Sequence, residues 1–328
     1  MLNDSLKLRA DLFDASAQKP TRDGFGSAMM ELGEREPRAV IVCADLAEST
    51  RALAFKMKYP ARYIEMGVAE QNMATVASGL ANYGKIPFMA SYAAFSPGRN
   101  NEQIRTTITL NNVPVKIMGM HAGVSVGPDG ATHQALEDMA LMRVQPNMIV
   151  ISPCDALEAH KAVLAVASNG KPSYVRFARE KTPVMTTDET PFEIGKANEM
   201  WRSAAPTVAV FATGPLLFEA LSAARDLEMQ GIGSVVVNVH TIKPLDEGAV
   251  ERAARECGAV VTVEEHQIAG GLGGAVAEAL ARRAPTPIEF IGVHDRYGQS
   301  GEPAELLREY GLDAPAIIEA MKQVIARK

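Results

Sequence analysis

Residues 66–84 read MGVAEQNMATVASGLANYG and place a single carboxylate, Glu70, at the start of an expected helix. Apolar residues such as Met73 and Ala77 follow it at helical spacing. No lysine or arginine follows Glu70 before Lys85, so no cation close in the sequence neutralises it. A carboxylate beside apolar side chains can share a proton with a ring nitrogen. The alternative is an exposed acidic residue that the helix dipole favours.

Short apolar runs alternate with helical patterns around this segment. Strands are expected at residues 39–44, 62–65, 86–90, 113–120, 148–152 and 173–177. Helices are expected at residues 21–36, 155–168 and in the segment that ends at 143. This alternation predicts a parallel sheet with helices on both faces. Polar loops follow the carboxyl ends of the strands, where open α/β sheets place their ligands.

The chain divides into four expected segments. Residues 1–20 form an N-terminal arm that docks on another surface, residues 21–185 a first domain, and residues 186–204 a linker rich in Pro, Thr and charge. Residues 205–328 form a second α/β domain. The predicted fold class is therefore α/β, with two consecutive domains that each hold a mostly parallel sheet flanked by helices.

The bulk composition limits the possible functions. A length of 328 residues suggests two domains, and a hydrophobic fraction of 47% is sufficient for two cores. The net charge of −6 gives no nucleic-acid signature. Three cysteines at distant positions show no metal-ligand spacing, which fits a reducing, cytoplasmic compartment. The start of the chain lacks the apolar run of a signal peptide, and no segment reaches the ~20 apolar residues of a membrane-spanning helix.

Residues 121–133 form a second segment that carries candidate functional residues. His121 and His133 stand at its ends, Asp129 lies between them, and glycines let the backbone approach a ligand. We interpret both histidines as ligand contacts.

Four arginines are candidate anion ligands, because a guanidinium holds phosphate through two parallel hydrogen bonds. They are Arg22, Arg99, Arg176 and Arg179. For each of them the alternative is a structural ion pair. Arg176 lies within an expected strand, where an unpaired charge would be costly.

Two further features have plain structural alternatives. Tyr92 and Phe95 follow a strand, and core packing is their default role unless a flat ring binds beside Glu70. Residues 270–274, GGLGG, resemble a dinucleotide fingerprint without its spacing, and the segment EEHQIA separates them from the preceding strand. We interpret them as helix-start packing, with anion binding as the alternative, and the same two alternatives apply to the nearby His266.

Several motifs together resemble one enzyme family. GVAEQNM (67–73), SYAAFSPGRNNEQIR (91–105) and DGATHQALED (129–138) are similar to the pyrimidine-binding half of transketolases. TIKPLD (241–246) and VEEHQIAGGLGGAVAEAL (263–280) are similar to their C-terminal domain. Over about residues 20–328 the chain resembles the C-terminal subunit of a split transketolase.

The resemblance implies thiamine diphosphate as cofactor. Glu70 would hydrogen-bond N1′ of its aminopyrimidine and favour the imino tautomer that deprotonates the thiazolium, while Tyr92 and Phe95 would flank the ring. His133 would contact substrate hydroxyls, and Asp129 would hold the α-hydroxyl. The phosphate end of the substrate would be held by His121, Arg22, Ser49 and Arg179, and Asp45 would lie at the seam between cofactor and subunit. The implied reaction transfers a two-carbon ketol unit from a ketose phosphate to an aldose phosphate.

The resemblance also implies a partner. Full-length transketolases carry an N-terminal half with a Gly-Asp-Gly segment for Mg²⁺ and diphosphate, and this sequence contains no Gly-Asp-Gly. We therefore expect a second polypeptide to supply those ligands, homodimerisation of this chain, and a heterotetramer of two chains of each kind. The arm is a candidate docking element for that partner.

Three other interpretations stay open. The chain has the length and domain order of the beta subunit of a 2-oxoacid dehydrogenase. It could also be half of a deoxyxylulose-phosphate-synthase-like enzyme, an interpretation that residues 264–274 (EEHQIAGGLGG) slightly favour. The third alternative is a non-catalytic subunit that only completes a partner. The THQALED segment and the two histidines favour transketolase, and Glu70 with its two aromatic neighbours argues against a non-catalytic role.

Overall fold

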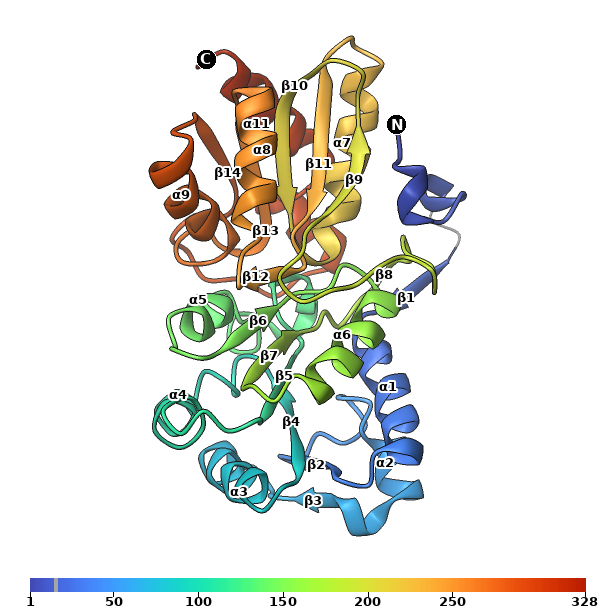
Figure 1. The fold of residues 1–328 in the computed structure, drawn as a ribbon, viewed down its shortest axis with the longest axis vertical. Helices are drawn as coiled ribbons and strands as arrows, with labels where there is room; N and C mark the ends of the chain where they lie inside the picture. The colour runs from blue at the N-terminus through green and yellow to red at the C-terminus, as the bar shows by residue number, and fades with distance from the viewer. Residues whose placement is uncertain (15–16) are drawn as a thin grey trace.

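The computed structural model describes residues 1–14 and 17–328 as two α/β lobes stacked end to end (Figure 1). The first lobe is built on a seven-stranded sheet of order β12-β6-β7-β5-β4-β2-β3, parallel except for β12. Its strands are β2 (Ala39–Cys43), β3 (Tyr63–Glu65), β4 (Ile86–Tyr92), β5 (Lys116–Met120), β6 (Ile149–Ile151), β7 (Ser173–Arg176) and β12 (Thr241–Lys243). All five residues of β2, AVIVC, are buried, as expected for a strand covered on both faces.

Helices cover both faces of this sheet, as the sequence predicts. They are α1 (Arg22–Arg35), α2 (Leu53–Lys58), α3 (Glu70–Asn82), α4 (Asn101–Gln103), α5 (Asp138–Arg143) and α6 (Ala156–Ser168). One apolar cluster holds Met73 of α3 and Met139 of α5, and the cluster on the other face holds Phe25 of α1 and Val163 of α6. At Gly24 the backbones of α1 and α6 approach so closely that a Cβ would lie 2.3 Å from the carbonyl oxygen of Ala156, so only glycine fits there.

The second lobe has a five-stranded sheet of order β14-β13-β10-β11-β9, parallel except for β9. Its strands are β9 (Asn198–Arg202), β10 (Pro206–Ala212), β11 (Gly233–Asn238), β13 (Val260–Gln267) and β14 (Ile288–Val293). Its helices are α7 (Leu217–Glu228), α8 (Glu247–Cys257), α9 (Leu272–Arg283), α10 (Pro303–Glu309) and α11 (Ala314–Ile325). The observed fold confirms the predicted α/β class. It also places a strand, β9, within the segment expected to be a linker.

The two lobes are joined by more than the connecting chain. β12 comes from the C-terminal part of the sequence but pairs with β6 in the first lobe's sheet, where Thr241 faces Ile151. A two-stranded antiparallel ribbon pairs β1 (Gln18–Pro20), near the start of the chain, with β8 (Lys181–Pro183), which follows β7 in the sequence.

The N-terminal arm packs on this chain's own second lobe. Its backbone extends β9 through a bridge between Leu2 and Trp201, and Asn3 N donates to the carbonyl oxygen of Met200 at 3.0 Å. Leu12 is buried in the second lobe's core, and the Phe13 ring meets the Trp201 ring edge-on at 6.2 Å. Leu6 and Leu12 of the arm are therefore buried against this chain's own second lobe, which corrects the expectation that the arm docks elsewhere.

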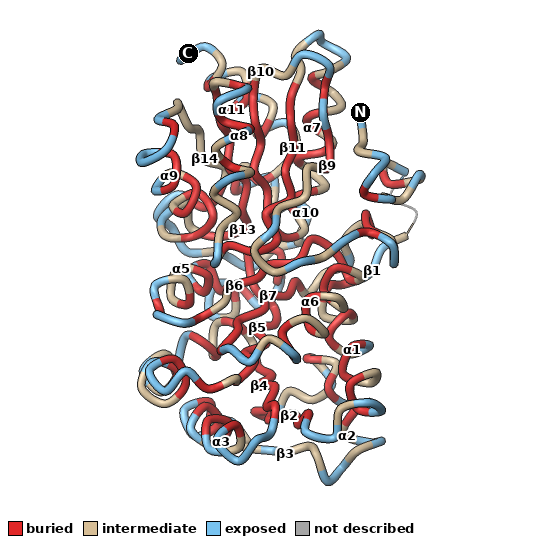
Figure 2. Tube along the Cα trace, in the orientation of Figure 1, coloured by how far each residue is buried: buried red, intermediate tan, exposed pale blue. Residues whose placement is uncertain are grey.

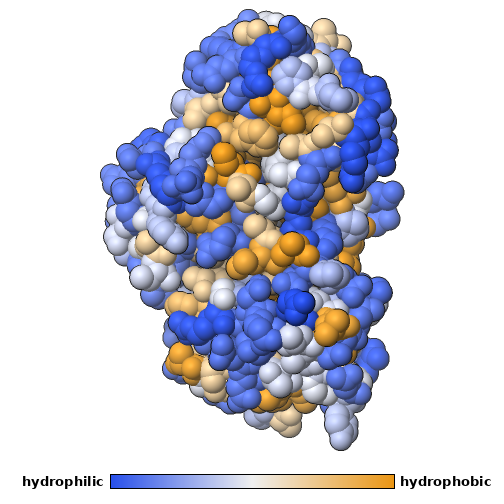
Figure 3. Space-filling view, turned by 90° about the vertical axis from the view of Figure 1, so that its left-hand side faces the viewer, coloured by the Kyte–Doolittle hydropathy of each residue, from blue (hydrophilic) through white to orange (hydrophobic). Residues whose placement is uncertain are grey.

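Figure 2 shows the buried residues gathered along the two sheets, with exposed residues in the outer helices and loops. The face in Figure 3 is mostly hydrophilic with separate, small hydrophobic patches. Within the described part of the chain, no helix has the length and apolar character needed to cross a membrane.

The arm yields a stability prediction. Leu12→Ala should lower the free energy of unfolding by about 2–4 kcal/mol, because it removes a large side chain that is 1% exposed. Urea unfolding followed by fluorescence suits this test, because Trp201 is the sole tryptophan and touches the arm. Leu110→Ala, at a side chain 74% exposed, is the matched control and should change little. Equal unfolding midpoints for the two variants would contradict the packing of the arm.

Candidate active site

The predicted site residues meet where four adjacent parallel strands end. β7, β5, β4 and β2 lie side by side in this order, so their carboxyl ends share one edge of the first lobe's sheet. Asp45 and Ser49 follow β2, Tyr92 ends β4, His121 follows β5, and Arg179 follows β7. This edge is the usual ligand position in open α/β sheets.

Four rings form a cluster at this edge. Tyr92 and Phe95 stack with centroids 5.8 Å apart and an interplanar angle of 25°. The His121 ring lies 4.0 Å from Tyr92, and the His133 ring lies 5.3 Å from Phe95 in an edge-on arrangement. The two histidines, 12 positions apart in sequence, thus flank one aromatic pair. The predicted grouping of these four side chains matches the observed geometry, while their chemical roles stay predictions.

Arg22 joins this ring cluster to a group of positive charges. Its Nη1 donates to the carbonyl oxygen of Ser49 at 2.9 Å and to Nε2 of His121 at 3.0 Å. Arg179 donates from Nη1 to the carbonyl oxygen of Val126 at 2.5 Å. A backbone carbonyl does not neutralise a guanidinium, so Arg22 keeps its positive charge, whereas Arg179 also lies 3.6 Å from a carboxylate oxygen of Glu180 and 3.8 Å from one of Asp129.

Burial and neighbouring cations both act on this group. Burial, reinforced by the charges of Arg22 and Arg179, lowers the pKa of His121 to about 3. Burial likewise lowers the pKa of Arg22, and Arg51 and Arg179 add to the effect by repulsion. Because a guanidinium only donates, Nε2 of His121 accepts and its proton belongs on Nδ1. An anion placed here would relieve the repulsion among these cations.

Two buried polar atoms in this group have no hydrogen-bond partner within the described residues. They are Nε of Arg22 and Nδ1 of His121. Both are N–H donors, and buried donors are normally satisfied. The donor set therefore fits a ligand that supplies acceptor oxygens.

Glu70 begins α3 and is 2% exposed, so it does not point into solvent. Its Oε2 accepts a hydrogen bond from Nη1 of Arg99 at 2.9 Å, and the Arg99 guanidinium lies 4.7 Å from the centroid of Phe95. Asn100 Nδ2 donates to the Glu70 backbone oxygen at 3.0 Å. No cation close in the sequence neutralises Glu70, but one that lies 29 positions later in the sequence pairs with it in the folded chain.

Asp45 and Asp129 lie at the rim of the site. Asp45 is exposed in a left-handed conformation (φ +56°), and Oε1 of Glu65 fixes its loop by accepting from the Asp45 amide at 2.8 Å. Asp129 lies 3.8 Å from Arg179. Glu65 and Arg51 are residues of this region that sequence reasoning missed. The signal for Glu65 is its place at the end of β3, which ends beside β2.

Two candidates turn out to be structural. Arg176, 5% exposed in β7, forms an ion pair with Asp138 at 2.9 Å and is not available to an anion. At the start of α9, Glu264 occupies the anion position: its carboxylate accepts from the amides of Leu272 at 2.7 Å and Gly273 at 2.8 Å. The strand β13 runs to Gln267. These facts support helix-start packing for residues 270–274 and correct the idea that EEHQIA separates them from a strand.

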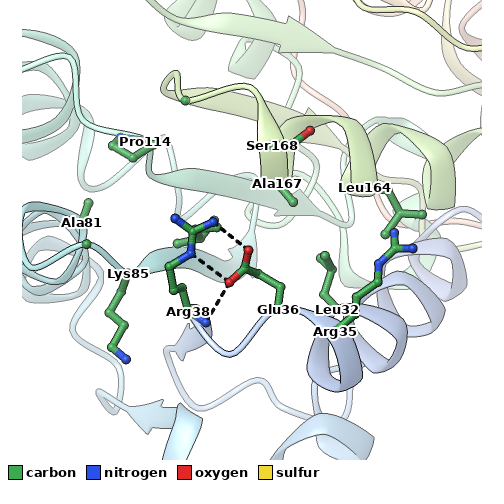
Figure 4. Close-up of a pocket in the computed structure, with 13 residues that line it drawn as sticks. Leu32, Arg35, Glu36, Arg38, Ala81, Lys85, Pro114, Leu164, Ala167 and Ser168 are labelled. Atoms are coloured by element: carbon green, nitrogen blue, oxygen red, sulfur yellow. Dashed lines mark hydrogen bonds and ion pairs between the residues drawn. The ribbon is translucent and has the colours of Figure 1, made fainter.

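Figure 4 shows a groove of about 550 Å³ that lies away from this site. It is at the amino ends of β2 and β4, where α1, α3 and α6 end. Its most central cation, Arg38, is already bound by Glu36 at 2.7 Å. Helix carboxyl ends carry partial negative charge, so this groove is poorly suited to an anionic ligand.

No group of three or more His, Cys, Asp or Glu side chains in residues 1–14 and 17–328 is arranged to hold a metal ion. All three cysteines are buried as free thiols.

Comparison with known proteins identifies the family. Residues 17–185 match the family described as "Transketolase, pyrimidine binding domain", and residues 195–317 match "Transketolase, C-terminal domain". The chain belongs to the transketolase family. This result confirms the resemblance found in the sequence motifs.

The relatives extend this similarity to nearly the whole chain. It is 41% identical over 312 residues to the "Putative transketolase C-terminal section" of Methanocaldococcus jannaschii, covering 93% of this chain and 97% of that protein. It is 38% identical to the "6-deoxy-6-sulfo-D-fructose transketolase subunit SqwH" of Clostridium sp., covering 94% and 95%. A solved structure described as "Split gene transketolase, inactive beta4 tetramer" aligns with a TM-score of 0.86 and 39% identity, covering 94% and 99%.

His121 provides a pH prediction. Its folded-state pKa of about 3 lies below the unfolded value of about 6.5, so only the unfolded chain binds this proton at pH 5. Stability from this group is complete above about pH 6.5 and is lost as the pH falls. Between pH 7 and pH 5 the wild-type chain should lose about 2 kcal/mol more than His121→Asn. Urea unfolding at the two pH values measures this difference, and equal acid sensitivity of the two chains would contradict it.

Proposed function

We propose that this chain is the catalytic C-terminal subunit of a two-chain, thiamine-diphosphate-dependent transketolase. The observation that carries the proposal is the meeting of Glu70, an aromatic pair, two histidines and an arginine group at the ligand edge of a transketolase-family sheet. The reaction is the transfer of a two-carbon ketol unit from a ketose phosphate to an aldose phosphate.

The chain's residues fit the aminopyrimidine of the cofactor. The buried carboxylate of Glu70 can bind a protonated ring nitrogen, and the stacked side chains of Tyr92 and Phe95 offer a surface for a flat ring. When bound, the cofactor would supply a nucleophilic carbon that attacks the ketose carbonyl and retains the two-carbon fragment. Glu70 then holds a proton at the ring nitrogen, and His133, whose ring packs on Phe95, contacts substrate hydroxyls.

The opposite end of the substrate is proposed to be anionic. Arg22 and His121 supply the two unpartnered donors described above, with Ser49 and Arg179 in the same group. Asp129, beside Arg179, would accept a hydrogen bond from a substrate hydroxyl. Phosphate fits this donor set, and a sulfonate, as in the name of the Clostridium relative, has the same oxygen geometry.

A second subunit is proposed to supply the residues that bind Mg²⁺ and the diphosphate, with Asp45 at the interface between the two chains. The names of the relatives, a C-terminal section and a transketolase subunit, support this arrangement. The inactive β4 tetramer of the solved relative further supports the need for a partner and self-association of this chain. We propose a heterotetramer in the cytoplasm. The names of these relatives favour transketolase over an oxoacid dehydrogenase subunit or a synthase half.

The first functional prediction concerns Glu70. In the complex of the two subunits, Glu70→Gln should lower the turnover number of ketol transfer by about 10²–10⁴-fold, because the amide cannot hold the proton. A coupled assay with phosphorylated donor and acceptor sugars measures this rate. Glu102→Gln, an exposed carboxylate on α4, is the control and should keep wild-type turnover. Near-normal turnover of the Glu70 variant would remove this assignment, and a wild-type complex without ketol transfer would refute the proposed reaction.

The second functional prediction concerns the anionic end of the substrate. Arg179→Ala should raise the KM of phosphorylated sugars by about 10–100-fold, the worth of a hydrogen bond between charged groups. Unphosphorylated sugars should show a much smaller change, so the ratio of the two effects is the measurement. Arg38→Ala, in the groove of Figure 4, is the matched control. A similar increase in KM for both kinds of sugar would count against a phosphate contact.

A further inference from the structure

The loop that carries Asp129 and His133 is held from the second lobe. Oε1 of Glu265, a residue of β13, accepts a hydrogen bond from the amide of Ser125 at 2.7 Å. Ser125 lies at the start of the short helix η5 (Val124–Asp129), which ends at Asp129. A carboxylate of one lobe therefore binds the first turn of the loop that carries Asp129 and His133 in the other lobe.

The sequence of the loop accommodates this carboxylate. Gly123 has φ +92°, and a Cβ there would lie 2.2 Å from Oε1 of Glu265. The backbone needs glycine at this point for both its conformation and its close approach. Gly123 also closes the base of the loop, because its amide donates to the carbonyl oxygen of Ala135 at 2.9 Å.

A short series of hydrogen bonds links η5 to His133 and so fixes where His133 lies. The Gly130 amide donates to the carbonyl oxygen of Gly127 at 3.1 Å, and the His133 amide donates to that of Gly130 at 3.0 Å. Nε2 of Gln134, 3% exposed, donates to the carbonyl oxygens of Val124 and of Gln299 at 2.9 Å each. Gln299 belongs to the second lobe, and the nearby α10 packs on η5. The second lobe thus holds both ends of the segment between Ser125 and Gln134.

The cost of burying Glu265 argues for a specific role. Its side chain is buried, 4% exposed, and burial raises its pKa, an effect that Arg176 and the Ser125 amide oppose. An uncharged side chain would fill this position at a lower cost of desolvation. We propose that Glu265 is a positioning residue of the transketolase reaction, fixing η5 so that Asp129 and His133 face the substrate. The consequence for catalysis rests on the proposed function.

Glu264 provides a matched control in the next position of the strand. It too is buried, 1% exposed, and accepts two backbone amide hydrogen bonds, but from α9 within its own lobe. Removing either carboxylate leaves buried amides without an acceptor, so both alanine variants should lose stability. Only the Glu265 variant should change the active-site loop.

Hydrogen exchange tests the positioning without requiring activity. In Glu265→Ala the exchange of amides in residues 122–135 should accelerate by at least about tenfold, whereas Glu264→Ala should affect the amides at 272–273 instead. Glu265→Gln should restore most of the protection, because its amide oxygen can accept from Ser125 N. If Glu265→Ala fails to fold, Glu265→Asp, which withdraws the carboxylate by one methylene, takes its place. Unchanged exchange in residues 122–135 would overturn the proposal.

Kinetics of the two-subunit complex then test the consequence. Glu265→Ala should lower kcat/KM by about tenfold or more with an unchanged Kd for thiamine diphosphate, while Glu264→Ala keeps both constants. Equal loss of activity in the two variants would reduce Glu265 to a purely structural role and overturn the proposal. A wild-type complex without ketol transfer would refute the proposed function, and the exchange result would still decide whether Glu265 holds the loop.

Discussion

The arrangement of the molecule depends on one buried ion pair. Arg176 in β7 binds Asp138 at the start of α5, and Tyr174 donates its hydroxyl to the same carboxylate at 2.5 Å. Nη2 of Arg176 also donates to the carbonyl oxygens of Ala135, at the base of the loop that carries Asp129 and His133, and of Glu265, in the second lobe. Separating such a pair costs about 3–5 kcal/mol, because it leaves a buried charge uncompensated. Arg176 therefore holds the first sheet, the loop and the second lobe together through one set of buried hydrogen bonds.

The charge of the site follows from how its arginines are satisfied. Arg22 donates to a backbone carbonyl oxygen, whereas the surface arginine Arg38 is paired with a carboxylate. Arg179 donates to a backbone carbonyl oxygen and also lies near the carboxylates of Glu180 and Asp129. A carbonyl satisfies the hydrogen bond but leaves the full positive charge in place. This arrangement carries a free-energy cost from charge repulsion and burial, which the lowered pKa of Arg22 reflects. It leaves a positively charged pocket that can bind an anion.

Local patterns were sufficient to predict the fold class and most elements. The run AVIVC predicts β2, and the helical spacing after Glu70 predicts α3, because burial on one or both faces sets the period of apolar residues. The polar strand β9 was missed, since Trp201 and Met200 are its only buried residues. β12, a three-residue strand in the other lobe's sheet, leaves no periodic signal.

The site could be predicted where it depends on strand order and not where it depends on distant partners. The side chains of Tyr92, His121 and Arg179 follow strand ends, and parallel strands bring such ends to one edge. The partners of Arg176 and of Glu70 lie 38 and 29 positions away in the sequence, so no local pattern reveals them. For the same reason the role of Glu265, 140 positions from Ser125, required the structure.

The pairing of Glu70 with Arg99 bears on how the carboxylate can be used. Glu70 is buried, whereas the Arg99 side chain is 50% exposed and rests on the face of Phe95. Because Glu70 is buried, losing Arg99 without a replacement would leave its charge uncompensated at a considerable cost, so Arg99 can leave only if another donor takes its place. Its departure would leave a buried carboxylate without a donor, and a protonated ring nitrogen stacked at Phe95 would restore that hydrogen bond. Under the proposed function, Arg99 would be the partner that satisfies Glu70 until the ring nitrogen of the cofactor replaces it.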